Sequence, residues 1–374
     1  MQPPSNYAPS QNEGSVARPA SIEARNRKEL AESDEEANME LLNQIRVVVR
    51  VRPLLQGEGV PYKRPITNTS GQMDFDCRRD IVNLRYDFKN KDMKTFKFDK
   101  VCDGSFGQKE FYNAIGVRGM VSQVVNGYHA TIFAYGQTGA GKTYTMEGYK
   151  YVQNSKGKWE PQIEQAISQG SVGIVQRCAA QLMKKIERVK GDRKVSVNVS
   201  FLQLYNERIY DLLNREMFKG RKNSVIGEGL KLKWNKYDVY TVENLLTVEI
   251  EEVEEILHLF HYGIQNKILG SHKMNMTSSR SHTIFTVTLE QIPVDNPDNT
   301  IVSKLQIVDL AGSERQNLTG SDGKMQKEAI EINKSLFTLR KVISALTERN
   351  QAGGADGEAM YVPYRDSKLT CLLR

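Results

Sequence analysis

The stretch YGQTGAGKTYTMEG, residues 135–148, carries the residue types and the spacing that bind phosphate. It matches the pattern G-x-x-x-x-G-K-[ST], in which glycines let backbone N–H groups converge on an anion without a Cβ in the way. Lys142 is placed to reach the β- and γ-phosphates of a nucleotide, and the Thr143 hydroxyl suits Mg²⁺. The motif therefore predicts that these residues bind a nucleotide: Gly136, Gln137, Thr138, Gly139, Ala140, Gly141, Lys142 and Thr143.

A second candidate is IVDLAGSE, residues 307–314, an apolar run that ends in Asp309. It resembles a Walker B element, in which the carboxylate supports the Mg²⁺ shell. Gly312 follows three residues later, where its backbone N–H could meet the γ-phosphate. An aspartate after a strand is common in folded proteins, so it is the pairing with the phosphate loop that favours a nucleotide site.

The third candidate is the polar cluster NMTSSRSH, residues 275–282. One interpretation is a polar turn before a strand, and the residue types alone favour it. The other is a hydroxyl ligand for Mg²⁺ beside an arginine that senses the γ-phosphate.

Strands and helices alternate around these motifs. Apolar, β-branched runs predict strands at 44–55, 129–136, 281–292 and 303–314. The run at 195–213 predicts a strand followed by a short helical turn. Helical periodicity places apolar residues on one face at 249–264 and at 332–346. We therefore expect an α/β fold of the P-loop NTPase type, with a central, mostly parallel mixed β-sheet and helices on both of its faces.

Composition narrows the class of protein. The 374 residues are 39% hydrophobic and 26% charged, and no run of about eighteen apolar residues predicts a membrane span. The N-terminal residues have no apolar core and so do not predict a secretory signal. The four cysteines form no CxxC pair, which favours reduced thiols over a zinc site or a disulfide framework.

Charge divides the chain into two parts. Residues 1–43 hold eight acidic and four basic residues, are poor in apolar residues, and are expected to be a disordered acidic extension. Because the whole chain carries +7, the remainder, 44–374, carries 48 basic and 37 acidic residues, a net charge of +11. Such a basic body suits a polyanionic partner, either nucleic acid or an acidic protein surface, or it is simply a solvated surface.

Taken together, the motifs resemble the kinesin motor domain over about residues 44–374. FAYGQTGAGKTYTMEG is similar to its phosphate loop, NMTSSRSHTIF to its first switch and LQIVDLAGSER to its second. Its main microtubule-binding helix resembles INKSLFTLRKVISAL, and the loop and helix that follow resemble YVPYRDSKLT. The opening strand of the family resembles RVVVRVRP. The resemblance implies a microtubule-stimulated ATPase motor that uses ATP/ADP and Mg²⁺.

The resemblance also assigns residues to the nucleotide. Arg50, Arg52 and Pro53 would border the adenine, and Tyr144 would stack on it where many family members have histidine. Thr143 and Ser279 would ligate Mg²⁺, with Asp309 holding a water of the metal. Arg280 and Glu314 would form the ion pair that closes the two switches. The implied catalytic residues are Lys142, Ser279, Arg280, Gly312 and Glu314.

The expected filament contacts are Lys334, Lys341, Arg365 and Lys368. A solvated face is the ordinary interpretation of Lys334 and Lys341, which lie opposite the apolar stripe of their helix. The resemblance implies that they meet the acidic surface of tubulin. It implies a microtubule-associated, cytoplasmic protein with no nucleic acid as its partner, and with any self-association through regions outside this chain.

The chain departs from the family pattern at its end. SKLTCLLR stops before the final strand, the last helix and the neck linker of the motor, so 44–374 is expected to be an incomplete motor domain. The start near residue 44 mildly favours the amino-terminal motor type, while direction, processivity and cargo stay open. Two alternatives remain: a non-motile microtubule-binding protein that keeps the fold, and a P-loop enzyme acting on nucleic acid.

Overall fold

The computed structural model describes residues 45–53, 73–85, 93–155, 157, 159–218, 229–234, 239–274, 280–314, 323–352 and 360–374. Residues 1–46 and 47–374 form separate units, and every element below belongs to the second. Of the first unit only Ile45 and Arg46 are described, so the expected disorder of residues 1–43 lies outside the described ranges.

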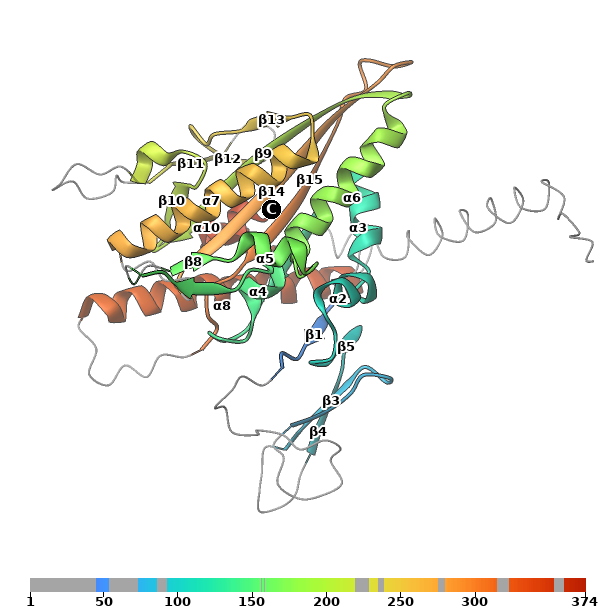
Figure 1. Cartoon of the computed structure of the whole chain (residues 1–374). Helices are drawn as coiled ribbons and strands as arrows, with labels where there is room; N and C mark the ends of the chain where they lie inside the picture. Colours follow the sequence, from blue (N-terminus) through green and yellow to red (C-terminus); the bar gives the residue numbers. More distant parts are fainter. Residues whose placement is uncertain are drawn as a thin grey trace, which may run out of the picture. The chain divides into compact units, whose positions relative to one another are not determined.

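A six-stranded sheet forms the centre of the second unit (Figure 1). Its strand order is β10–β9–β14–β15–β6, with β13 paired to β9. These strands are β6 (Ala130–Ala134), β9 (Arg193–Tyr205), β10 (Arg208–Asp211), β13 (Val248–Ile250), β14 (His282–Pro293) and β15 (Ile301–Asp309). The expected mixed sheet is confirmed, but its mostly parallel character is wrong. Among the described pairs of this sheet only β6 and β15 run parallel, because β9–β10 and β14–β15 are hairpins with short connections.

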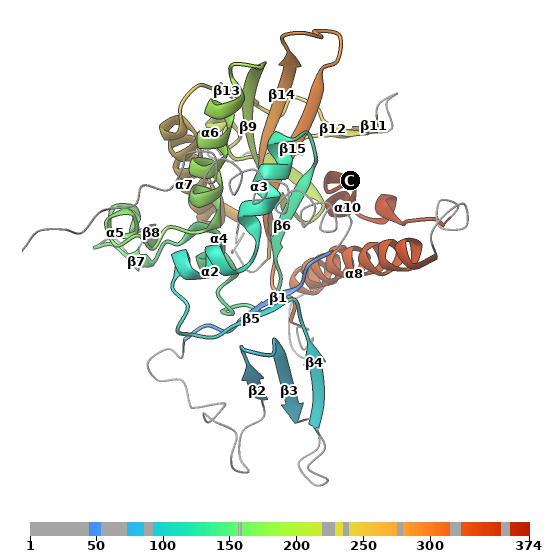
Figure 2. The same ribbon diagram turned by 90° about the vertical axis from the view of Figure 1, so that its right-hand side faces the viewer.

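Alternating side chains along the strands give the sheet two hydrophobic faces. Phe201, Phe285 and Ile307 point into one hydrophobic cluster together with residues of α3, α6 and α7. Their neighbours Leu202 and Ile284 point into the other cluster, which α8 and α10 cover. Figure 2 shows the two layers of helices on opposite sides of the strands, so the predicted helices on both faces are confirmed.

The helices described are α2 (Gln108–Ala114), α3 (Val117–Val125), α4 (Lys142–Glu147), α5 (Ile163–Ser168), α6 (Ile174–Val189), α7 (Val253–Met274), α8 (Gly323–Ala352) and α10 (Lys368–Leu372). The predicted helical stretches at 249–264 and 332–346 lie largely within α7 and α8. Two short 3-10 helices, η1 and η2, span Arg215–Phe218 and Tyr364–Asp366. None of the helices in the described ranges is long and apolar enough to cross a membrane.

Smaller sheets surround this centre. β1 (Val48–Arg50) pairs with β5 (Lys100–Cys102) in parallel, and three antiparallel groups complete the set. These groups are β2 (Met73–Asp76), β3 (Ile81–Arg85) and β4 (Met93–Lys97); β7 (Tyr151–Gln153) and β8 (Trp159–Pro161); and β11 (Leu232–Trp234) and β12 (Tyr240–Val242).

The segment after β9 differs from its prediction as a short helical turn. Asn206 and Glu207 have positive φ of 50° and 56°, and together they form a two-residue turn into β10. Consecutive left-handed residues match the twist of a hairpin, and asparagine tolerates that conformation well. The chain therefore returns along β9, where Ile209 pairs with Leu204, and a 3-10 turn follows only at η1.

Candidate nucleotide-binding site

The phosphate loop connects β6 to α4, as its sequence predicts. Gly139 and Gly141 have φ of 79° and 94°, in the left-handed region that favours glycine. A Cβ built on Gly139 would meet nothing within 4 Å, so it is the backbone conformation, and not packing, that requires glycine there. Repeated positive φ in a short loop is the conformation that turns successive N–H groups toward an anion.

Lys142 spans the loop that it follows. Its Nζ donates to the carbonyl oxygens of Gly136 and Gln137 at 2.8 and 3.0 Å. Burial lowers the pKa of Lys142, and the nearby carboxylates of Asp309 and Glu314 oppose that shift. The ammonium is therefore held within the loop, close to two carboxylates.

Asp309 lies beneath the loop because β15 runs parallel to β6. The register pairs Asp309 with Ala134, so both strands end at the same edge of the sheet. Asp309 Oδ2 accepts a 2.6 Å hydrogen bond from the Thr143 hydroxyl. Its Oδ1 is buried and has no hydrogen-bond partner within the part of the chain that the structure describes. A carboxylate oxygen with spare acceptor capacity beside a threonine hydroxyl is a donor set that fits Mg²⁺.

Glu314, five residues after Asp309, also contacts the phosphate loop. Its carboxylate accepts from the backbone N–H and the hydroxyl of Thr138, at 2.9 and 2.5 Å. Burial raises the pKa of Glu314, but these hydrogen bonds and the charge of Lys142 outweigh it and lower the pKa overall. Gly312 lies below this contact, where a Cβ would come within 2.5 Å of the Glu314 carboxylate and the Thr138 hydroxyl.

The predicted pair between Arg280 and Glu314 stays a prediction. Glu314 contacts Thr138 here, whereas Arg280 lines a small hollow of about 10 Å³ with Glu207, His282 and Glu331. Ser279, the predicted magnesium ligand, lies outside the described residues.

His282 connects three elements and was not singled out by sequence reasoning. Its Nδ1 accepts from the backbone N–H of Ala311 at 3.0 Å, so Nε2 carries the proton and donates to the Ser335 hydroxyl of α8 at 2.9 Å. Burial, assisted by the charge of Lys142, lowers the pKa of His282 to about 4. The imidazole is therefore neutral at pH 7 and bonds the end of β15 to α8.

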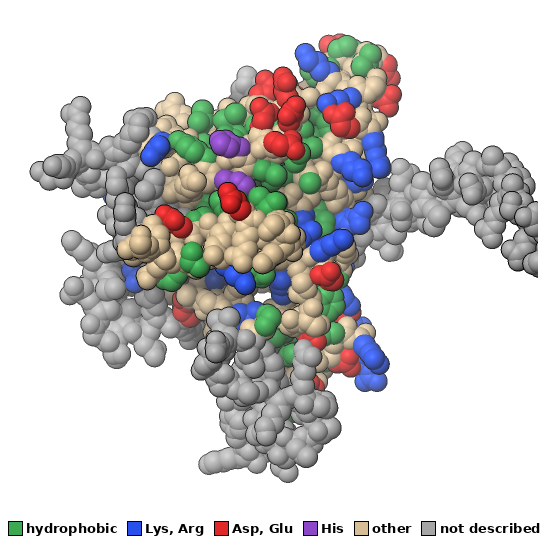
Figure 3. All heavy atoms as spheres, viewed as in Figure 1, with side chains coloured by type: hydrophobic (Ala, Val, Ile, Leu, Met, Phe, Trp, Pro, Cys, Tyr) green, Lys and Arg blue, Asp and Glu red, His purple; other side chains and the backbone are tan. Residues whose placement is uncertain are grey.

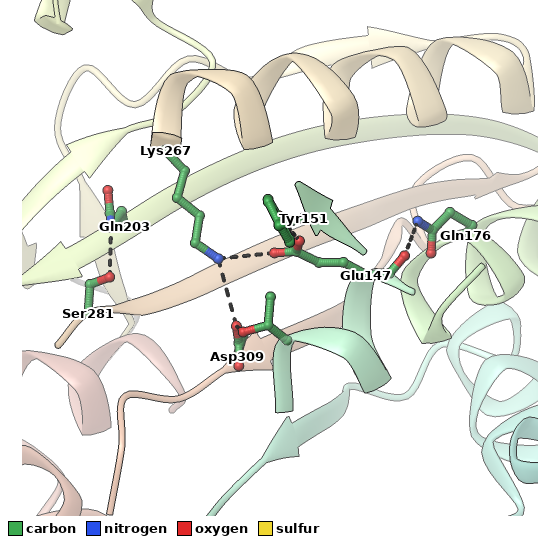
Figure 4. A network of polar contacts seen from close by, with 8 residues as sticks. Glu147, Tyr151, Gln176, Gln203, Lys267, Ser281 and Asp309 are labelled. Carbon is green, nitrogen blue, oxygen red and sulfur yellow. Dashed lines mark hydrogen bonds and ion pairs between the residues drawn. The ribbon is translucent and has the colours of Figure 1, made fainter. Parts of the chain in front are cut away.

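A buried charge network lies on the other side of Asp309 (Figure 4). Lys267 Nζ from α7 is 3.0 Å from Glu147 Oε1 and 3.7 Å from Asp309 Oδ2. The Tyr151 hydroxyl donates to Glu147, and the Gln176 side chain donates to the Glu147 carbonyl oxygen at 2.7 Å. Burial lowers the pKa of Lys267, but Glu147 and Asp309 outweigh it and raise the pKa, so Lys267 stays charged.

The predicted adenine residues lie together only in part. Arg50 Nη1 donates at 2.9 Å both to Gln108 Oε1 and to the Thr145 hydroxyl, and the guanidinium is 5.7 Å from the centroid of the Tyr144 ring. Tyr144 is 37% exposed, which leaves its ring accessible. Arg52 Nη1 donates to the carbonyl oxygen of Pro53 at 3.1 Å. Stacking of a base on Tyr144 stays a prediction.

The predicted filament residues differ in what they contact. Lys334 and Lys341 are exposed on α8, and Lys341 Nζ is 4.9 Å from the ring centroid of Phe337, itself 57% exposed. Arg365 is exposed on η2. Lys368 differs because its Nζ donates to the carbonyl oxygen of Glu207 at 2.5 Å.

Comparison with known proteins identifies the family. The sequence model described as the kinesin motor domain matches residues 50–374. The chain belongs to the kinesin motor domain family. It is 36% identical over 339 residues to the kinesin-like protein klp-20 of Caenorhabditis elegans, covering 90% of this chain and 45% of that protein. It is 39% identical over 283 residues to the chromosome-associated kinesin KIF4A of Homo sapiens, covering 75% of this chain and 20% of that protein.

Solved kinesin structures agree with this assignment. The structure of a fast kinesin superposes with a TM-score of 0.69 at 32% sequence identity, covering 88% of this chain and 81% of that one. The C-terminal motor and motor homology domain of Kar3Vik1, fused to a synthetic coiled coil, gives a TM-score of 0.68 at 28% identity, covering 94% of this chain and 82% of that one. This kinesin chain spans less than half the length of the relatives named above.

Proposed function

We propose that this chain is the head of a microtubule-stimulated ATPase motor, with residues 44–374 as its motor domain. The observation that carries the proposal is the arrangement around Asp309. The Thr143 hydroxyl bonds this carboxylate from above, and Ala311, two residues later, bonds to α8 through His282. A phosphate loop and a candidate filament helix are thus connected through one short segment.

The phosphate loop and Lys142 would bind the phosphates of ATP. Thr143 and Asp309 fit as magnesium ligands, directly or through water, and Ser279 would join them. Magnesium, when bound, neutralises charge that develops on the phosphates. Lys142 assists in that task, because its ammonium is already held at the loop by two carbonyl oxygens.

Glu314 and Gly312 would read the γ-phosphate. We propose that Glu314 leaves Thr138 and pairs with Arg280 when ATP binds, which holds an attacking water in line and gives its proton a route to the carboxylate. Gly312 would then present its N–H to the γ-phosphate. Because Ala311 precedes it and bonds His282, this movement would change the hydrogen bond that His282 makes with Ser335 of α8.

The exposed basic residues on α8 and η2 support a microtubule as the partner. Lys334, Lys341 and Arg365 would contact an acidic filament surface and confer microtubule association. Lys368 would act on the same side by fixing the β9–β10 turn against α10 through Glu207, and would contact the filament less directly.

Steady-state ATPase activity measured with and without polymerised tubulin tests this function. We expect strong stimulation by microtubules. Microtubule binding without ATP hydrolysis would support the non-motile alternative, and stimulation by DNA instead would support a P-loop enzyme acting on nucleic acid.

A further inference from the structure

Gln108, the first residue of α2, lies between two of the residues that are predicted to contact the adenine. Its side chain is buried, with 5% of the residue exposed. Its Oε1 accepts from Arg50 Nη1 at 2.9 Å, and its Nε2 donates to the carbonyl oxygen of Tyr144 at 2.6 Å. One side-chain amide therefore connects the end of β1 to α4, and both of these elements lie beside α2 in Figure 2.

Only one orientation of the Gln108 amide satisfies both contacts. A guanidinium can only donate and a carbonyl oxygen can only accept, so Oε1 must face Arg50 and Nε2 must face Tyr144. The exchanged orientation would place two donors together at Arg50 and two acceptors together at Tyr144. Because the amide is buried, water cannot relieve such a mismatch. A carboxylate or an apolar side chain of the same length would lose at least one of the two hydrogen bonds.

The Arg50 guanidinium also contacts a second residue of α2. Phe111 lies one helical turn after Gln108, and its ring centroid is 4.3 Å from the guanidinium, a favourable cation–π distance. On its other contact the guanidinium is 5.7 Å from the ring centroid of Tyr144. Phe111 is buried, whereas Tyr144 is an exposed residue. Buried side chains of α2 therefore hold the arginine that lies next to an accessible aromatic ring. We call Arg50 and Tyr144 the base platform.

The base platform is also connected to the phosphate loop. Arg50 Nη1 donates to the Thr145 hydroxyl at 2.9 Å, and that hydroxyl donates to the carbonyl oxygen of Gly141 at 2.8 Å. These two hydrogen bonds do not involve the Gln108 amide. A change at position 108 should therefore act on the base platform, while Thr145 stays bonded to the loop.

We propose that Gln108 is a positioning residue for nucleotide binding, which orients the base platform formed by Arg50 and Tyr144. The proposal rests on the proposed function, because it takes as ligand a nucleotide whose base stacks on Tyr144. Gln108 acts through its two partners: it holds the Arg50 side chain and the Tyr144 backbone in place before the nucleotide arrives, so that less conformational entropy is lost on binding. The phosphate loop binds the phosphates without its help.

Calorimetric titrations with MgADP and with magnesium pyrophosphate separate the contribution of the base from that of the phosphates. Neither ligand has a γ-phosphate, so hydrolysis does not disturb the measurement. Gln108→Met keeps an unbranched side chain of similar length but removes both hydrogen bonds. The variant should bind MgADP about tenfold more weakly, since stacking of the base is impaired. Its affinity for pyrophosphate should stay within about twofold. Equal weakening of both ligands would overturn the proposal.

Gln181 of α6 offers a matched control. Its Oε1 accepts from the Tyr112 hydroxyl at 2.6 Å, and its Nε2 donates to the carbonyl oxygen of Arg118 at 2.8 Å. These are the same two kinds of hydrogen bond, made to none of the predicted nucleotide-binding residues. Gln181→Met should lower the free energy of unfolding in urea, as Gln108→Met does, but leave the affinity for MgADP unchanged. An equal loss of MgADP affinity in both variants would reduce Gln108 to a structural role.

A double variant tests whether Gln108 acts through Tyr144. Tyr144→Ala removes the ring on which the base would stack. Adding Gln108→Met to Tyr144→Ala should weaken MgADP less than Gln108→Met does in the unchanged chain, because residues that act as a unit are not additive. Full additivity of the two losses would contradict the proposal.

Gln108→Glu serves if Gln108→Met does not fold. The glutamate keeps an acceptor for Arg50 and places its second oxygen against the Tyr144 carbonyl oxygen, which is repulsive. This variant should also lose affinity for MgADP and keep its affinity for pyrophosphate. Unchanged binding of MgADP by Gln108→Glu would show that the contact with Tyr144 does not position the platform.

This proposal and the proposed function can fail separately. If the unchanged chain bound pyrophosphate as tightly as MgADP, the placement of the base on Tyr144 would be wrong. Tighter binding of MgADP that Gln108→Met leaves unchanged would contradict the role of Gln108 alone. A selective loss in Gln108→Met, together with no stimulation of ATPase activity by microtubules, would support Gln108 as a positioning residue and contradict the motor function.

Discussion

Glu314 lies against Thr138 of the phosphate loop, beside the position that we propose for the γ-phosphate. It accepts two hydrogen bonds from Thr138, and the glycine that would meet the γ-phosphate lies directly beneath it. Because its pKa is lowered, Glu314 is a carboxylate at neutral pH, and a carboxylate repels a phosphate. We infer that binding of ATP and departure of Glu314 from Thr138 are coupled.

Glu314→Ala should separate binding from chemistry. The variant keeps the phosphate loop intact, so ATP should bind at least as tightly as before. Hydrolysis should fall by about 100-fold or more, because the variant lacks the carboxylate that we propose to order the water and receive its proton. Single-turnover hydrolysis alongside nucleotide binding checks this. Glu290→Ala, an exposed glutamate on β14, serves as the control, and normal turnover by Glu314→Ala would contradict the assigned role.

Lys267 holds two buried carboxylates that belong to different elements. Its α7 stripe, which includes the fully buried Ile256, Phe260 and Ile264, continues to Lys267 at helical spacing. A lysine within an apolar stripe is the signal in the sequence that could have indicated a buried partner. Its identity could not be predicted, because Glu147 lies 120 residues away and only the fold brings the two together. The contact between Thr143 and Asp309, in contrast, followed from two motifs of known geometry.

Lys267→Met should destabilise the folded state by about 3 kcal/mol, since it leaves the Glu147 charge buried without its partner. Urea unfolding measures this. The double variant Lys267→Met with Glu147→Gln removes both charges and should recover most of the loss. Equal free energies of unfolding for the single and double variants would show that the Lys267–Glu147 ion pair does not contribute to stability as argued.

At the scale of elements, the end of β15 is tied to two helices by side chains. Thr143 attaches it to α4, and His282 attaches it to α8 through Ser335. Strand β14 supplies His282, because its residues 283–291 pair with the whole of β15 and His282 directly precedes them. A shift of Ala311 therefore cannot leave α8 unchanged without breaking a buried hydrogen bond.

His282 also predicts a pH dependence of stability. Its folded pKa of about 4 is below the ordinary value of 6.5, so between these values the unfolded chain binds more protons than the folded one. Stability should therefore fall as pH drops from 6.5 toward 4, by about 2 kcal/mol at pH 5 from this group alone. Urea unfolding at pH 7 and pH 5 checks it. His282→Gln should lose less stability between the two pH values, and an identical loss would contradict the assignment.

Helices and strands were predicted most accurately where the apolar residues follow only one period, either that of a strand or that of a helix. Strands β6, β14 and β15 and helices α7 and α8 lie where alternation or helical spacing placed them. The run at 195–213 was predicted as a strand followed by a short helical turn, whereas its second part forms the hairpin strand β10. The local backbone conformation explains the difference. Asn206 and Glu207 both have positive φ, which suits a two-residue hairpin turn and does not occur within a helix. Strand direction in the sheet was mispredicted because connection lengths, not composition, decide it.

For the whole molecule, the distribution of charge over the two faces of the sheet affects which face an acidic filament would bind. On the side shown in Figure 3, acidic side chains gather near the start of α7 and basic ones along α6. Lys334 and Lys341 lie on α8, which packs on the other sheet face. Both faces carry basic residues, so net charge alone does not select the face that binds.

The double variant Lys334→Ala with Lys341→Ala should weaken microtubule binding by roughly fivefold, and the salt dependence should become shallower. Cosedimentation at several salt concentrations measures both. The matched control is Lys184→Ala with Lys190→Ala, which removes two exposed lysines from the α6 side. A loss as large in the control would indicate that binding depends on total charge and not on the α8 face.

The β14–β15 hairpin has the candidate nucleotide site at one end and an exposed loop at the other, where an insertion can be tolerated. Its nine paired positions run from Asp309 opposite Thr283 to Ile301 opposite Gln291, a span of roughly 27 Å. Residues 294–300, which join the strands at the far end, are all exposed. Exposed loop tips accept insertions well. A fluorescent protein or an affinity tag placed between residues 296 and 297 should therefore leave nucleotide binding intact, and so allow this head to be immobilised or imaged by a handle away from the phosphate loop.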